Sequence, residues 1–209
     1  MRLYHGLVLL AVAVAPAVAM ADDLNLSTGV ATYNVTPPSG PTITALDSPA
    51  NPAWVLTIPG ATWINTNGSG TVGVANGLYV YTTTFTLSST SDLSGSFTGD
   101  NGVSAFLSGG SIVGMDPLAS STYLESFNVI TPFSADDLGP GTYTLTFDLE
   151  NGSGLNTPPG SDGNSDAGPS GLLVGANTVT ATPEPSSLAL LGTSILGAAG
   201  IARRRLFSR

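Results

Sequence analysis

The sequence predicts an all-β fold, a sandwich of two packed sheets, and three observations support this. Only 9% of the 209 residues are charged, against about 25% in an average soluble domain. Glycine (26 residues) and proline (15 residues) are plentiful, which is typical of short strands joined by turns. Alternating apolar and polar runs recur between residues 22 and 181, where helical periodicity is scarce. We therefore expect one β-domain over residues 22–181.

The strand with the clearest pattern is Leu78–Leu87, in which Tyr79, Tyr81 and Phe85 share one face and threonines fill much of the other. The other candidate strands are Trp54–Ile58, Thr71–Ala75, Leu93–Thr98, Val103–Leu107, Ser111–Gly114, Tyr123–Val129, Tyr143–Leu149 and Gly171–Thr180. Eight or nine short strands at this spacing favour a jelly-roll β-sandwich. The polar segment Asn151–Gly171 is predicted to be a long loop.

The distribution of charge excludes several kinds of chemistry. The five basic residues are Arg2, Arg203, Arg204, Arg205 and Arg209, and the one histidine is His5, whereas all 14 acidic residues lie between them. Residues 22–181 therefore lack a catalytic imidazole, a Schiff-base lysine and any cation for phosphate or nucleic acid. Zinc sites built on His or Cys are excluded too, because the chain has no cysteine. We expect no catalytic residue and no obligatory cofactor.

The N-terminal residues 1–21 are typical of a signal peptide. Arg2 supplies a positive start, an apolar stretch follows, and Ala19-Met20-Ala21 forms an A-x-A cleavage site for signal peptidase. A buried N-terminal strand or helix is the alternative. Cleavage after Ala21 would make this a secreted protein.

The C-terminal residues 182–209 combine three features in a fixed order. The tripeptide Pro183-Glu184-Pro185 comes first, the apolar run Leu188–Ala202 follows, and Arg203-Arg204-Arg205 comes last. The run has 15 residues, near the lower end of what spans a membrane, and the arginines favour a cytoplasmic C-terminus. We expect a short transmembrane helix here.

This order resembles the PEP-CTERM sorting signal. The resemblance implies that an exosortase, a membrane transpeptidase of Gram-negative bacteria that make exopolysaccharide, is a partner. By position, Pro183, Glu184 and Pro185 match the recognition motif, and Arg203–Arg205 match the membrane stop. A plain C-terminal anchor with a chance tripeptide is the alternative.

A second resemblance covers roughly residues 75–181. It is carried by Leu93–Phe97, Asp100-Asn101, Gly109-Gly110, Ile112–Gly114, Phe127, Gly141–Phe147, Asn151 and Pro169–Val174. This order is similar to the galactose-binding-like jelly-roll domains found in glycosidase accessory modules. The resemblance implies a carbohydrate-binding module, but no binding residue is carried over, because the region has no arginine or histidine to hold sugar hydroxyls.

Two sets of residues are candidates for binding. Trp54 and Trp63, the only tryptophans, could stack on sugar rings, with the hydrophobic core as the alternative, favoured for Trp54. Asp162, Asn164 and Asp166 have a D-x-N-x-D spacing that could hold calcium, with a solvated acidic turn as the favoured alternative.

Together these features predict an exported, non-catalytic protein at the cell surface or in the extracellular matrix, associated with exopolysaccharide and biofilm. A carbohydrate-binding module is the first hypothesis. A self-associating structural protein with no ligand is the second. A glycosidase based on two carboxylates is the third and least favoured.

Overall fold

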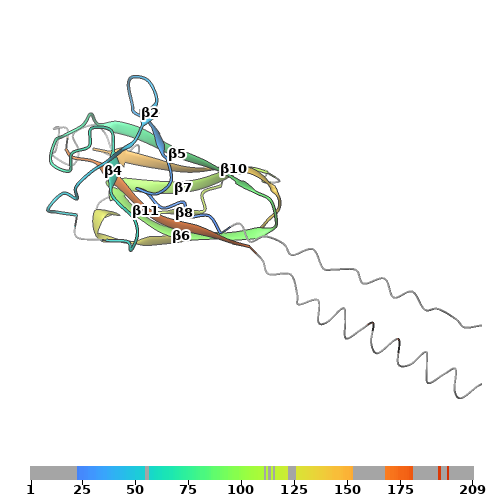
Figure 1. The fold of residues 1–209 in the computed structure, drawn as a ribbon. Coiled ribbons are helices and arrows are strands. Elements are labelled where there is room, and N and C mark those ends of the chain that lie inside the picture. The colour runs from blue at the N-terminus through green and yellow to red at the C-terminus, as the bar shows by residue number, and fades with distance from the viewer. Residues whose placement is uncertain are drawn as a thin grey trace, which may run out of the picture. The chain divides into compact units, whose positions relative to one another are not determined.

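The fold is described from a computed structural model, in which residues 23–54, 57–110, 112, 114, 116–121, 126–152, 168–180, 193 and 197 are described. The chain divides into two compact units, and every described strand belongs to the unit Ala21–Ala181. That unit is a sandwich of antiparallel strands (Figure 1). Residues 1–21, Pro183–Pro185, Arg203–Arg205 and the calcium candidates Asp162, Asn164 and Asp166 lie outside the described residues.

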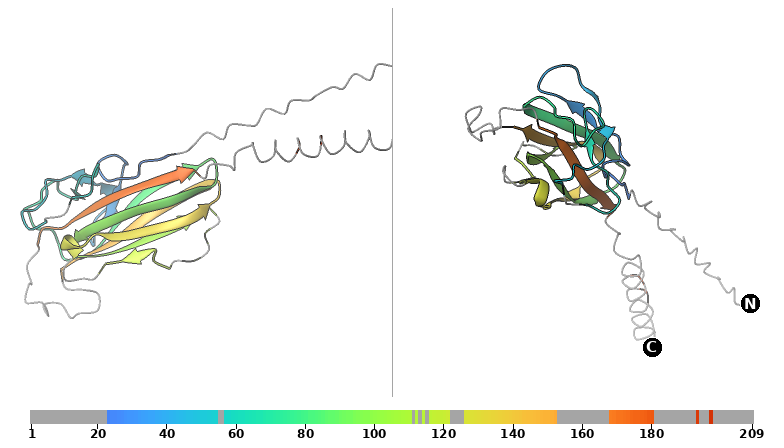
Figure 2. Two further views of the ribbon diagram at one scale, coloured as in Figure 1. Left: turned by 90° about the horizontal axis from the view of Figure 1, so that it is seen from below. Right: turned by 90° about the vertical axis from the view of Figure 1, so that its left-hand side faces the viewer.

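The strands form two sheets, here called the β5–β10 sheet and the β6–β11 sheet. The first has the order β2-β1-β5-β10-β7-β8 and the second the order β3-β4-β11-β6-β9. Figure 2 shows β9, β6 and β11 side by side in the second sheet. The strand bounds are β1 Asn34–Thr36, β2 Ile43–Thr44, β3 Leu46–Asp47, β4 Ile64–Asn65, β5 Gly77–Leu87, β6 Ser91–Asp100, β7 Gly102–Gly109, β8 Ala119–Ser120, β9 Thr131–Leu138, β10 Gly141–Asn151 and β11 Gly171–Thr180.

The strand pairing confirms the predicted jelly roll. β4 pairs with β11, β5 with β10, β6 with β9 and β7 with β8, each pair antiparallel. The four pairs are nested, as in one long hairpin. Successive pairs of this hairpin alternate between the two sheets, which is the jelly-roll arrangement. The short strands β1, β2 and β3 extend the two sheets beyond this set of eight.

The core between the sheets follows from the alternating pattern of the strands. On β5 the buried hydrophobic residues are Tyr79, Tyr81, Phe85 and Leu87, and on β10 they are Tyr143, Leu145, Phe147 and Leu149. The ring of Phe147 lies 5.5 Å from that of Phe97 and 5.8 Å from that of Phe133, both in edge contact. These rings join the two sheets at the centre of the sandwich.

An N-terminal segment that the sequence did not reveal as structural lies along β11. The amides of Leu26 and Thr28 donate to the carbonyls of Ala176 and Val174 at 2.8 and 3.0 Å, and the Thr178 amide donates to Leu24 at 2.9 Å. Leu26 is buried in the main core.

The predicted strand Tyr123–Val129 is wrong over its described part, because Ser126–Asn128 is a 3₁₀ turn. The strand in this region is β9, which begins at Thr131 and escaped prediction. β9 contains Pro132 and the pair Asp136-Asp137, residues that are rare inside strands. They are tolerated because β9 is an edge strand with an irregular register near Asp137, whose amide donates to the Asp92 carboxylate at 2.9 Å.

The predicted strands Trp54–Ile58 and Thr71–Ala75 are also wrong in their described residues, which form bends and irregular chain. Their backbone groups bond to local turns, to a distant loop or to the Asn151 side chain, and they do not pair along a neighbouring strand. The Trp54 amide donates to Asn51 at 2.8 Å, and the Val74 amide donates to Gly168 at 2.9 Å. Alternation alone could not distinguish these loops from strands.

Candidate functional site

Both tryptophans cover the outer face of the β6–β11 sheet. Trp54 and Trp63 stack on each other with ring centroids 4.4 Å apart. With Ile58 and Leu173 they form a small second core, separate from the core between the sheets. The absence of a side chain at Gly171 permits this packing, since a Cβ there would lie 2.8 Å from the Trp54 ring.

A half-buried carboxylate anchors this tryptophan pair at the end of β6. The indole Nε1 of Trp54 donates to Asp100 Oδ2 at 2.7 Å, and the Ser170 hydroxyl donates to the Asp100 backbone carbonyl at 2.6 Å. Burial raises the pKa of Asp100, and the hydrogen bond from Trp54 opposes the rise by favouring the charged form. Asp100 therefore fixes the covering segment to the sheet.

The burial of these rings bears on the sugar-stacking hypothesis. Trp54 and Trp63 each expose 4% of their surface, so neither has a ring face open to solvent. The core placement that the sequence favoured for Trp54 is observed, and Trp63 shares it. The indole Nε1 of Trp63 is buried without a hydrogen-bond partner. Stacking of either ring on a sugar would require the covering segment to open.

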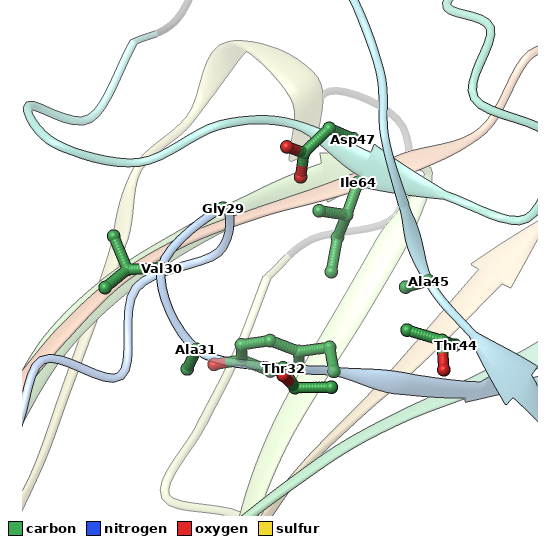
Figure 3. A pocket seen from close by; sticks show the side chains of 9 residues that line it. Gly29, Val30, Ala31, Thr32, Thr44, Ala45, Asp47 and Ile64 are labelled. Atoms are coloured by element: carbon green, nitrogen blue, oxygen red, sulfur yellow. The ribbon is translucent and has the colours of Figure 1, made fainter.

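A cleft of about 200 Å³ lies at the edge of the sandwich where β2 gives way to β3 (Figure 3). In Figure 3, Asp47 and Ile64 lie on one side of the cleft, and Ala31 and Thr32 lie on the other. Thr44 and Ala45 close a third side. The lining thus contains both polar groups, which are hydroxyls and one carboxylate, and apolar side chains.

The electrostatics of the cleft are set by one carboxylate. The Asp47 side chain is exposed, and it is the one acidic side chain among the described residues that line the cleft. No lysine, arginine or histidine occurs between residues 6 and 202. Thr32 and Thr44 are exposed, and their hydroxyls can donate and accept hydrogen bonds. The cleft can therefore bind uncharged polyols or cations, and it repels anions.

The outer face of the β5–β10 sheet is the second polar surface. Three threonine pairs face one another across β5 and β10: Thr82 with Thr146, Thr84 with Thr144, and Thr86 with Thr142. The hydroxyl oxygens of the second and third pairs lie 3.3 and 3.1 Å apart. None of these six side chains is fully buried, so the array forms a hydroxyl-rich face on the sandwich.

The carboxylates of Asp100, Asp148 and Glu150 do not line the cleft. Asp148 and Glu150 follow one another on the outer face of β10, Asp100 lies on the other sheet, and Glu125 is outside the described residues. Burial raises the pKa of Asp148. Within the described part of the chain, no three acidic, histidine or cysteine side chains are grouped as a metal site would need.

Sequence reasoning missed the cleft residues Thr32, Thr44 and Asp47. Each lies in or beside a strand of two or three residues, which is too short to show a periodic pattern. An isolated aspartate between Leu46 and Ser48 carries no motif either. Only the pairing of β1 with β2 and of β3 with β4 brings these residues together.

Comparison with known proteins identifies the tail. Residues 181–205 match the PEP-CTERM protein-sorting motif, which includes the predicted Pro-Glu-Pro tripeptide and the three arginines. The motif implies that the protein is exported, sorted by an exosortase and anchored to the membrane or surface through its C-terminal region. Within the described residues, no helix is long and apolar enough to cross a membrane.

Solved structures with similarity to the chain include two of a GH2 beta-galacturonidase from Eisenbergiella tayi. In the form bound to glycerol, the match has 16% identity and a TM-score of 0.40 and covers 75% of this chain. In the form bound to galacturonate, the values are 14%, 0.42 and 74%. The chain spans 24% of the length of each of these proteins. Comparison with curated protein sequences found no match.

Proposed function

We propose that the exported jelly-roll domain is a non-catalytic module that binds neutral sugars at the cell surface or in the extracellular matrix. The observation that carries this proposal is the cleft of Figure 3, which combines hydroxyls, one carboxylate and small apolar surfaces without a cation. A sugar ring presents the complementary mixture of hydroxyl groups and apolar C–H surface. The sorting motif supports a location at the cell surface, where polysaccharides occur.

The charge of the domain narrows the ligand class. Thirteen of the 14 acidic residues lie between residues 22 and 181, and no basic residue accompanies them. A polysaccharide that carries carboxylates or sulfates would be repelled unless divalent cations bridged the two. Neutral glycans, and amino-sugar polymers with positive charge, have no such penalty. The exopolysaccharide of a Gram-negative host is the partner that we propose on this basis.

A single carboxylate in the cleft favours binding over hydrolysis. Glycosidases use two carboxylic groups on either side of the scissile bond, about 5–9.5 Å apart. Asp47 has no second acidic side chain beside it among the described lining residues. We therefore propose that the domain holds a sugar without cleaving it.

The test is a binding measurement on the full-length protein in detergent with a panel of neutral monosaccharides and oligosaccharides. Asp47→Ala removes the charged acceptor, and we expect its affinity to fall about tenfold or more. Asp116→Ala is the matched control, because Asp116 is exposed and does not line the cleft. Saturable binding that Asp47→Ala leaves unchanged would move the site elsewhere, and no binding to any neutral sugar would refute the proposed function.

A further inference from the structure

A row of side chains leads from the cleft across the outer face of the β5–β10 sheet. The register places Thr44 of β2 opposite Asn34 of β1, and Asn34 in turn opposite Thr82 of β5. The row continues through Thr146 of β10 to Phe106 of β7. Side chains of directly opposed residues in antiparallel strands lie on the same face. One line therefore connects the cleft with the far half of the sheet.

We propose that this row is an extended binding surface for a linear neutral glycan, with one end of the bound segment in the cleft and the chain lying across the strands. This inference rests on the proposed function and specifies its ligand as a chain instead of a single sugar. Thr44 belongs to both parts, since it lines the cleft and begins the row.

The dimensions of the row suit a polymer. Neighbouring strands lie about 4.7–4.9 Å apart, so the four steps from Thr44 to Phe106 span roughly 19 Å. Each step is comparable with the length of one sugar residue in an extended chain. Successive sugars can therefore meet successive strands.

The chemistry of the row matches a neutral sugar chain. Threonine hydroxyls and the Asn34 amide both donate and accept hydrogen bonds, as sugar hydroxyls require. Asn34 is exposed, and Thr82, Thr146 and Phe106 are each partly exposed. Phe106 adds one apolar ring surface at the end of the row, where a sugar can place its C–H groups.

Electrostatic repulsion disfavours three competing partners, namely nucleic acid, an acidic polysaccharide and a second copy of the domain. No side chain of the row is charged, and the flanking row contains the Asp148 carboxylate between Val80 and Ser104. A nucleic acid or an acidic polysaccharide would meet this carboxylate with no compensating cation in the domain. A second copy of this acidic domain would meet the same repulsion.

The test is affinity electrophoresis of the full-length protein through native gels that contain soluble neutral glucan or galactomannan, with free oligosaccharides of increasing length as competitors. We expect competition to improve with length from the monosaccharide to about the tetrasaccharide. The double variant Thr82→Val/Thr146→Val keeps the β-branched shape and removes two hydroxyls from the row. It should weaken polymer binding about tenfold and change monosaccharide binding less than about twofold.

The matched control is Thr86→Val/Thr142→Val, the same change on the same two strands but off the row. It should bind like the unchanged protein, and both variants should unfold at the same temperature. Length-independent competition, or equal polymer binding by both variants, would overturn the extended surface while leaving the proposed function intact. Failure of every neutral glycan to bind would refute both. A change in oligomeric state caused by the row variant alone would instead assign the face to self-association.

Discussion

The two outer faces of this sandwich differ in their exposure to solvent, because aromatic side chains cover part of one face and hydroxyl groups lie at the surface of the other. On the β6–β11 sheet, Trp54 and Trp63 cover Leu173 and Gly171 and are themselves buried. On the β5–β10 sheet, paired threonines and Phe106 remain at the surface. The aromatic side chains that usually serve sugar binding thus stabilise one face, and hydroxyl groups occupy the other. Under the proposed function, recognition would therefore rely on hydroxyl and carboxylate groups and not on the two tryptophans.

The largest effect on stability is expected when a tryptophan that covers the β6–β11 sheet is truncated. Trp54→Ala deletes a buried ring and leaves Asp100 without its indole donor, so we expect a loss of about 3–5 kcal/mol in the free energy of unfolding. Chemical denaturation followed by far-UV circular dichroism measures it. Trp54→Phe keeps an aromatic ring and should lose less. A loss below about 1 kcal/mol for Trp54→Ala would show that the covering segment is not part of the folded core.

Gly171→Ala tests the same packing from the strand on which the two tryptophan rings lie. The added Cβ would lie 2.8 Å from Trp54 and 3.3 Å from Trp63, which predicts a cost of about 1–3 kcal/mol from overpacking. Fluorescence is a direct probe, because the chain has no tryptophan besides these two. Gly139→Ala is the control, since its Cβ would meet nothing within 4 Å. Equal stability of the two variants would contradict the packing described.

The Asp100 carboxylate gives the covered face a pH dependence. Because burial raises its native pKa above the ordinary value of 3.8, the folded protein binds this proton more tightly than the unfolded chain. Its contribution to stability is therefore present at low pH and is lost as the pH rises through the raised pKa. Asp100→Asn keeps an acceptor for Trp54 without the charge.

We accordingly expect Asp100→Asn to melt at the same or a higher temperature than the unchanged protein at pH 7, and to lose this advantage at pH 3. Thermal melts across that range measure the difference. Asp92→Asn, an exposed carboxylate on the same strand, controls for net charge. A melting temperature lowered at pH 7 by Asp100→Asn alone would mean that the charge stabilises the native state.

The smallest effect is expected on the open face. Thr84→Val/Thr144→Val removes one hydroxyl pair whose oxygens are 3.3 Å apart at the surface, and we expect a change within about 0.5 kcal/mol. Denaturant titration against Trp54→Ala sets the scale. A loss of more than about 2 kcal/mol would contradict this expectation and would show that the threonine pair stabilises the sheet.

The sequence predicted the parts of the fold that have strong periodicity. β5, β10 and β11 were found because threonine alternates with aromatic residues or because a buried run is flanked by turns. β9 was missed because its proline and paired aspartates are tolerated only at an edge. The cleft could not be predicted, since Thr32, Thr44 and Asp47 meet only through non-local pairing of very short strands. The sorting motif was found because its three parts are contiguous.

The most direct test of the neutral-glycan assignment is affinity electrophoresis of the full-length protein in parallel gels. One gel contains a neutral glucan or galactomannan, and the other contains polygalacturonate. Both contain a chelator, which prevents divalent cations from bridging the protein and the polymer. The polar cleft predicts retardation by a neutral polymer, and the absence of basic residues between residues 6 and 202 predicts none by polygalacturonate. The Asp47→Ala variant should migrate faster than the unchanged protein in the gel that retards the latter. Retardation by polygalacturonate alone, or by neither class of polymer, would contradict the account.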